Sequence, residues 1–196
     1  VANKSFRFGT VNNAGTTTWA GGWISGGAGA VFNNQAGGVF DAQTNATMQY
    51  DGGGGGGITF NNAGTFRRSV DTGTIAFSST PVNNTGTVNA QTGTLQFGSS
   101  GYTQTAGSTL LNGGNLKFDT AASFQGGELR GAGTVTGSVT NSGGQVTPGL
   151  SPGILTITGN YTQSGTGVLN VEIGGATVGT EYDRLAVTGT ATLGGT

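Results

Sequence analysis

The chain contains no cysteine and no histidine, and only 3 of its 196 residues are proline. The missing side chains exclude disulfide bonds, zinc sites built from Cys and His, thiol nucleophiles and any catalysis that uses imidazole as its base. The composition therefore excludes many types of enzyme mechanism. We expect no catalytic residues, no metal site and no cofactor.

Charge is also scarce, with 7 basic and 8 acidic residues and a net charge of −1. The basic residues are scattered, apart from the pair Arg67-Arg68, so they form no electrostatic footprint for nucleic acid or an anionic membrane. No apolar run approaches the roughly 18 residues that would span a bilayer. The first residues lack the apolar segment of a signal peptide, so we expect any export signal to have been removed or to lie outside this chain. Neither nucleic acid nor membrane insertion is expected.

Glycine is abundant, with 42 residues, and 33% of the chain is hydrophobic. Disordered chains usually combine low hydrophobicity with high net charge, whereas here Val, Ile, Leu and Phe recur throughout and the net charge is small. The composition therefore favours one folded, elongated domain with a narrow, evenly spread core.

A motif of two asparagines, a small residue and glycine repeats along the chain. It occurs at residues 12–15, 61–64 and 83–86, with a looser copy at 33–37, so the intervals between copies are 21, 28 and 22 residues. The long interval contains Asp51 followed by six glycines, and removing residues 51–57 as an inserted loop returns an interval of 21. The underlying period is about 21 residues.

A second motif keeps the same period. It consists of an aliphatic residue, one polar residue and an aromatic residue, and its aromatic members are separated by 27, 20 and 21 residues. The pairs are Met48/Tyr50, Ile75/Phe77, Leu95/Phe97 and Leu116/Phe118. Because partners two residues apart on a strand point to the same side, we expect the aromatic residues to stack as an interior ladder.

Between these motifs, apolar residues alternate with Thr, Asn, Gln and Ser in runs of three to five residues that end at Gly or Asn. Short strands with a turn every six to eight residues predict a coil with one three-sided turn per repeat. The sequence therefore predicts an all-β fold, a right-handed parallel β-helix (β-solenoid) of about nine rungs, over residues 1–196. The glycine loop at 51–57 would protrude from its side.

Corners of such a coil need residues that tolerate positive φ, and stacked asparagine side chains can hydrogen-bond from rung to rung. We therefore interpret the repeated asparagines as structural corner residues. They are Asn12, Asn13, Asn61, Asn62, Asn83 and Asn84.

Two tryptophans near the N-terminus are the candidate glycan contacts. Trp19 and Trp23 flank Gly21-Gly22, and a pair of indoles is suited to stacking on sugar rings. We expect one of the two to fill the core.

The last seventy residues resemble the passenger repeats of autotransporters and related large bacterial adhesins. The resemblance is carried by the runs at 126–129, 133–135, 147–155, 159–163 and 182–195, including the turn pairs Pro148-Gly149 and Pro152-Gly153. It implies a parallel β-helix exported to the cell surface, often as part of a longer polypeptide, and it offers no catalytic residues. It indicates architecture more than function.

Three other functions are known for such a coil. A glycosidase or lyase needs clustered acids, and the nearest set is Glu172 with Glu181, Asp183 and Arg184, which could gather on adjacent rungs. The strand predicted from Val168 to Ile173, however, points Glu172 outward as an ordinary solvated residue. A calcium site of the nonapeptide type lacks its repeated Asp. The Thr-x-Thr pairs that would suit ice binding do not keep the 21-residue period.

The sequence therefore predicts an extracellular or cell-surface scaffold or adhesin without catalytic activity. The alternative is a filament or sheath subunit that stacks end to end. Unpaired strand edges at the ends of a coil template further strands, so we expect homotypic end-to-end or lateral contacts or continuation of the same polypeptide, with glycans as further partners.

Overall fold

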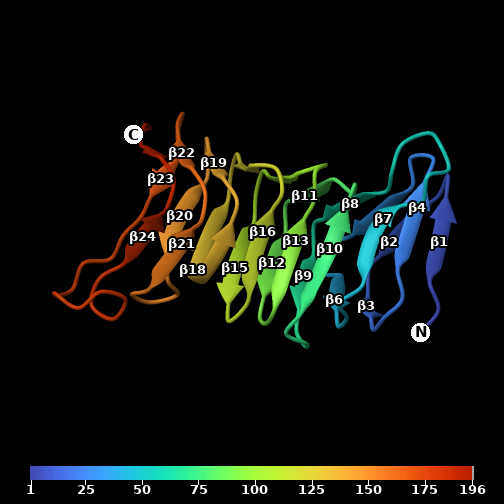
Figure 1. The fold of residues 1–196 in the computed structure, drawn as a ribbon, viewed down its shortest axis with the longest axis horizontal. Coiled ribbons are helices and arrows are strands. Elements are labelled where there is room, and N and C mark those ends of the chain that lie inside the picture. Colours follow the sequence, from blue (N-terminus) through green and yellow to red (C-terminus); the bar gives the residue numbers. More distant parts are fainter. Residues whose placement is uncertain (196) are drawn as a thin grey trace.

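The chain folds into one continuous coil of short parallel strands. The structure is a computed structural model that describes residues 1–195, and Figure 1 shows its strands stacked along the long axis with the termini at opposite ends. Within this range there are 25 strands and no helix, and every pairing between strands is parallel. The predicted parallel β-solenoid is confirmed. A right-handed sense is the rule for parallel connections and stays a prediction here.

Each turn of the coil contributes one strand to each of three faces, named A, B and C in chain order. Face A contains β1 (Lys4–Arg7), β4 (Ile24–Gly27), β7 (Thr47–Tyr50), β10 (Thr74–Ser78), β13 (Thr94–Phe97), β16 (Asn115–Phe118), the second half of β18 (Glu128–Thr136), β21 (Ile154–Ile157) and β24 (Arg184–Val187). Face B contains β2 (Thr10–Asn13), β5 (Val31–Asn34), β8 (Thr59–Asn62), β11 (Val82–Asn84), β14 (Tyr102–Gln104), β17 (Ala122–Phe124), β19 (Val139–Asn141), β22 (Tyr161–Gln163) and β25 (Ala191–Thr192). Face C contains β3 (Thr16–Trp19), β6 (Val39–Ala42), β9 (Thr65–Arg68), β12 (Thr87–Ala90), β15 (Ser108–Asn112), the first half of β18, β20 (Gln145–Pro148) and β23 (Val168–Leu169).

The described residues make eight complete coils, and β24 and β25 begin a ninth. This agrees with the predicted repeat length of about 21 residues, although the ninth rung is only partly formed. At a strand spacing of about 4.8 Å, the stack is roughly 40 Å tall. Strand β18 continues through one corner, so faces A and C join into one sheet of 16 strands while face B is a separate sheet of 9 strands.

The core is a narrow column filled by alternate residues of every strand. In the middle of the column Phe66, Ile75, Phe77, Val88 and Leu95 have no exposed surface. Each strand places its even or odd residues inward, because side chains alternate across a strand, and the parallel register puts like residues above one another. The short alternating runs of the sequence therefore supply a continuous interior.

The aromatic ladder forms over three rungs, with one difference from the predicted alignment. Phe77 and Phe97 stack with their ring centres 5.8 Å apart, and Phe97 and Phe118 stack at 5.4 Å. On the preceding rung Met48, and not Tyr50, pairs with Phe77. The prediction that Tyr50 belongs to this ladder is wrong, because β7 is displaced by two residues where it leads into the glycine insertion.

The glycine-rich insertion has no strand between Tyr50 and Thr59, and it lies against the first two coils (Figure 1). The N–H of Ala28 donates to the carbonyl of Gly54 at 2.9 Å, and the Arg7 guanidinium is paired with Asp51 at 2.6 Å. The loop is therefore tied to the N-terminal coils by these contacts.

The C-terminal part departs from the predicted strands. The expected strand from Val168 to Ile173 contains only the two residues of β23, and the chain then leaves the coil until β24 begins at Arg184. Val171 and Ile173 are exposed there, so their alternation with polar residues did not indicate a buried strand.

Candidate functional site

Face B carries two parallel ladders of amide side chains, one inside the coil and one outside it. The inner ladder occupies the last residue of each strand, in the register Asn13, Asn34, Asn62, Asn84, Gln104. Each side-chain N–H donates to the carbonyl oxygen of the next amide, at 2.8, 2.7, 2.7 and 3.0 Å. These buried amides also donate to backbone carbonyls at the start of face C, for example Asn62 to Thr87 at 3.0 Å. The ladder thus fixes the corner between faces B and C.

The inner ladder ends in a small buried polar cluster on the fifth rung. The Tyr102 hydroxyl lies 2.5 Å from the Thr109 hydroxyl and donates to Gln104 Oε1 at 3.2 Å. Burial raises the pKa of the Tyr102 phenol, so this group stays protonated and structural. Phe124 takes the next position, and Asn141 and Gln163 resume the row beyond it.

The outer ladder is formed by the asparagine before each inner one. Asn33 donates to Asn12, Asn61 to Asn33 and Asn83 to Asn61, each at 2.9 Å. Its hydrogen bonds run in the opposite direction along the coil from those of the inner ladder. The spacing of the motif predicts asparagines stacked from rung to rung, but the two separate rows follow only from the strand register.

The asparagines lie at the ends of strands, and none of them has a positive φ. The expectation that they provide positive φ at the corners is therefore wrong. Among the described residues the non-glycine positive-φ positions are Phe8, Ala28, Asp71 and Ser79, and the others are glycines. The rung-to-rung hydrogen bonding expected of Asn12, Asn13, Asn61, Asn62, Asn83 and Asn84 is present in the structure.

A groove of about 540 Å³ runs beside the outer ladder, along the corner between faces B and C. The residues that line it include the outer asparagines Asn33, Asn61 and Asn83 and the turn residues Ala36 and Ala63. The period of the groove is that of the coil, so the same amide recurs at each rung, about 4.8 Å apart.

The outward row of face B continues past the groove with hydroxyl side chains. Thr103, Ser123, Thr140, Thr162 and Thr192 follow Asn83 in register. The neighbouring column, two residues earlier, is irregular, with Thr10, Val31, Thr59 and Pro81 on successive rungs. A single regular row does not make the two-dimensional threonine array that ice binding needs.

The two tryptophans have different surroundings. Trp19 is 2% exposed and its indole N–H donates to the carbonyl of Gly22 at 2.7 Å, so it fills the core. Trp23 is 51% exposed, and its backbone N–H donates to Asn3 Oδ1 at 2.8 Å. Of the two candidate glycan contacts, only the Trp23 indole is available at the surface.

The acidic residues near the C-terminus are largely engaged by backbone. Asp183 is buried and accepts hydrogen bonds from the N–H groups of Gly153 and Glu172, at 2.8 and 2.9 Å. Glu181 accepts from Thr177 and Ala176, and these hydrogen bonds lower the pKa of its carboxyl group. Glu172 and Asp183 line a small pocket of about 130 Å³ with Arg130, while Glu181 does not.

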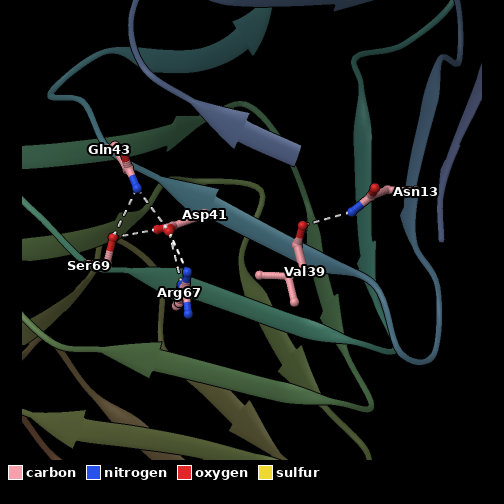
Figure 2. Close-up of polar contacts among 6 residues, drawn as sticks. All are labelled: Asn13, Val39, Asp41, Gln43, Arg67 and Ser69. Atoms are coloured by element: carbon pink, nitrogen blue, oxygen red, sulfur yellow. Dashed lines mark hydrogen bonds and ion pairs between the residues drawn. The ribbon is translucent and has the colours of Figure 1, made fainter. Parts of the chain in front are cut away.

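One further carboxylate, that of Asp41, is buried on face C, and Figure 2 shows its polar contacts. Asp41 accepts from the Ser69 hydroxyl at 2.7 Å, from the Arg67 guanidinium at 2.8 Å and from the Gln43 amide at 3.0 Å. Burial by itself raises the pKa of Asp41, but these hydrogen bonds and the Arg67 charge outweigh it and hold the pKa below its ordinary value. Arg67 lies on the neighbouring strand β9, Ser69 directly follows β9, and Gln43 directly follows β6.

The described part of the chain contains no cluster of three or more residues suited to metal ligation. No helix long and apolar enough to cross a membrane is found among residues 1–195. No protein family, curated protein or solved structure matches this chain.

Proposed function

We propose that this chain is a non-catalytic scaffold or adhesin segment of a bacterial cell surface, of the autotransporter passenger type. The observation that supports the proposal best is the uninterrupted stack of rungs, in which side-chain ladders on face B reinforce the backbone pairing along the coil. A stack of this kind makes a rod from short repeats, and the rod offers its long faces for contact.

Hydrogen bonding between rungs suits a rigid rod. Each hydrogen bond between rungs contributes roughly 0.5 to 1.5 kcal/mol net, and the buried amides add bonds that water cannot easily replace. Cohesion needs no disulfide bonds, metal ions or charge networks, and the described residues contain only four ion pairs. An extracellular location is part of the proposal and follows from the resemblance to exported passenger repeats.

The surroundings of the acidic residues support a non-catalytic role. Glycoside hydrolysis needs two carboxylates on opposite sides of a scissile bond, one of them free to donate a proton. Asp183 accepts hydrogen bonds from two backbone N–H groups, and Glu181 lies outside the pocket that Asp183 lines with Glu172.

The test is adhesion of beads coated with the whole chain to bacterial and host-cell surfaces, compared with beads coated with an inert protein. We expect retention of the coated beads and no release of reducing ends from a panel of polysaccharides. Release that disappears in the variant Glu172→Gln would contradict the proposal and assign catalysis to the pocket around Asp183.

End-to-end assembly is the second candidate function, and one feature of the N-terminal coil favours it. An apolar cavity of about 230 Å³ opens there between Phe6, Val11, Trp19, Phe32 and Phe40. The outer edges of β1, β2 and β3 are unpaired in the structure, so one further coil of parallel strands would continue the hydrogen bonding and cover the cavity. That coil would come from the same polypeptide or from a second copy.

Analytical ultracentrifugation of the purified chain shows whether copies stack end to end or remain monomeric. A concentration-dependent series of oligomers that Val11→Lys abolishes would support assembly through this end. A monomer of 19.3 kDa at all concentrations would remove the filament hypothesis and leave the scaffold proposal standing.

A further inference from the structure

Charge is distributed unevenly around the coil. Face B and the turns that lead from it to face C contain no Lys, Arg, Asp or Glu in the described part of the chain. All 15 charged residues lie either on faces A and C or in the remaining turns and loops. A whole face of the rod, along its full length, therefore presents only neutral amide, hydroxyl and small apolar groups.

The outer asparagines on this face have unused hydrogen-bonding capacity. A primary amide has two N–H donors and two lone pairs. Within the ladder, Asn33 and Asn61 each use one N–H to the preceding amide and accept one bond from the following amide. One donor and one acceptor on each of these two amides, which line the groove, therefore remain without a partner in the ladder.

This pattern matches a particular chemistry. A sugar hydroxyl is both donor and acceptor, and vicinal hydroxyls present such groups in pairs. An anionic polymer would need cations that the groove does not contain, because nothing lining it is charged. An extended polymer with repeating hydroxyl pairs is thus the complement of an amide ladder that repeats at each rung.

The shape of the groove favours a single extended chain over a second rod as its occupant. The groove is an open hollow of about 540 Å³, lined by the outer amides and by turn residues that include Ala36 and Ala63. The flat face of another coil would lie across the groove and leave it unfilled, whereas a single extended chain would occupy it and reach the amides.

We propose that the groove along Asn33, Asn61 and Asn83 binds an extended neutral polysaccharide, with the outer amides hydrogen-bonding its hydroxyl groups. The proposal rests on the adhesive function proposed above and assigns it a ligand class and a site. It places the main glycan contact on face B, away from the exposed Trp23.

The test is isothermal titration calorimetry of the whole chain with two neutral linear oligosaccharides, cellohexaose and maltohexaose, and with an oligogalacturonate as the acidic comparison. We expect one of the neutral oligosaccharides to bind with an affinity that does not change between low and high salt, because no ion pair is involved. The double variant Asn33→Ala/Asn61→Ala removes two amides and should weaken binding about ten-fold or more.

Two further variants control for folding. Thr140→Ala/Thr162→Ala alters the same outward row far from the groove and should leave the affinity unchanged. Ala63→Leu narrows the groove without removing an amide and should weaken binding while the ladder stays intact, which keeps the test decisive if the double asparagine variant is destabilised.

Three results would overturn the proposal. They are the absence of heat with both neutral oligosaccharides, an affinity that survives both groove variants, and binding confined to the acidic oligosaccharide. Self-association that the asparagine variant abolishes would assign the groove to a second copy instead. If coated beads adhere equally well with and without the groove variants, the adhesive function stands and only its assignment to the groove fails.

Discussion

At the residue scale, the same amino acid has two roles on adjacent positions. Asn61 and Asn62 are neighbours in β8, yet one faces the groove and the other is buried in the corner. The buried amide is bonded on both sides and to the backbone, whereas the outer one keeps part of its capacity for solvent or a ligand. Substitutions at the two sites should therefore have different consequences.

Asn62→Ala is expected to lower the free energy of unfolding by about 3 kcal/mol, because it removes the buried hydrogen bonds to Asn34, Asn84 and Thr87 and leaves the Asn84 side-chain carbonyl without its donor. The matched variant Asn61→Ala removes only partly exposed bonds and should cost less than about 1 kcal/mol. Urea unfolding followed by far-ultraviolet circular dichroism measures both. Equal costs at the two positions would mean that the inner ladder has no special stabilising role.

Asp41 predicts a pH dependence of stability. Its folded-state pKa is lowered, so the stabilisation is fully present above the unfolded-state value of about 3.9 and is lost as the pH falls through the folded-state value. Asp41→Asn should therefore reduce the drop in melting temperature between pH 7 and pH 3, and Ser69→Ala, which removes the 2.7 Å bond to the carboxylate, should reduce it in part. Melting curves of the three proteins that fall in parallel with pH would argue against this role.

At the element scale, the sequence predicts the strands well where its two motifs keep their period. The register of β10, β13 and β16 follows from Phe77, Phe97 and Phe118, because equal spacing of like residues stacks them. The register of β7 could not be derived, since the glycine insertion shifts the strand by two residues and spacing alone does not show how a loop is absorbed. The excursion after β23 was missed because alternation at Val171 and Ile173 imitates a strand.

The candidate site was predictable in part. The 21-residue recurrence of Asn-Asn pointed to stacked amides, but the groove depends on which asparagine faces outward, and this is set by the register of face B. The sequence also determines the lack of charge on face B, but this can be recognised only when residues 21 apart are placed on one surface.

Deleting residues 51–57 tests the insertion as an element. The repeat then returns to 21 residues, so we expect the coil to persist, with β7 free to align as β10 does. Local stability should fall in the first two coils, because the contacts of Ala28 with Gly54 and of Arg7 with Asp51 are lost. Hydrogen exchange resolved by residue gives the measurement. Loss of protection throughout the chain would show that the loop is required for folding of the whole coil.

At the scale of the whole molecule, the strands of each coil pair only with those of the coils before and after it, so stability depends on neighbours and varies along the rod. The interior of the middle coils is fully buried, as Leu95 and Phe97 show. Towards the C-terminal end Leu169, Leu185 and Val187 are only partly buried against the core. The rod should open from its ends and not from its centre.

Amide hydrogen exchange should therefore be slowest in the strands from β10 to β17 and fastest in β1 to β3 and β23 to β25. The same measurement also addresses assembly, because a coil that stacks on the open edge of β1 to β3 would donate or accept the hydrogen bonds now facing solvent. If the chain assembles end to end, protection at the terminal strands should rise with protein concentration while that of β13 stays constant. Rising protection along face B instead, with the ends unchanged, would indicate that copies associate side by side through the uncharged face.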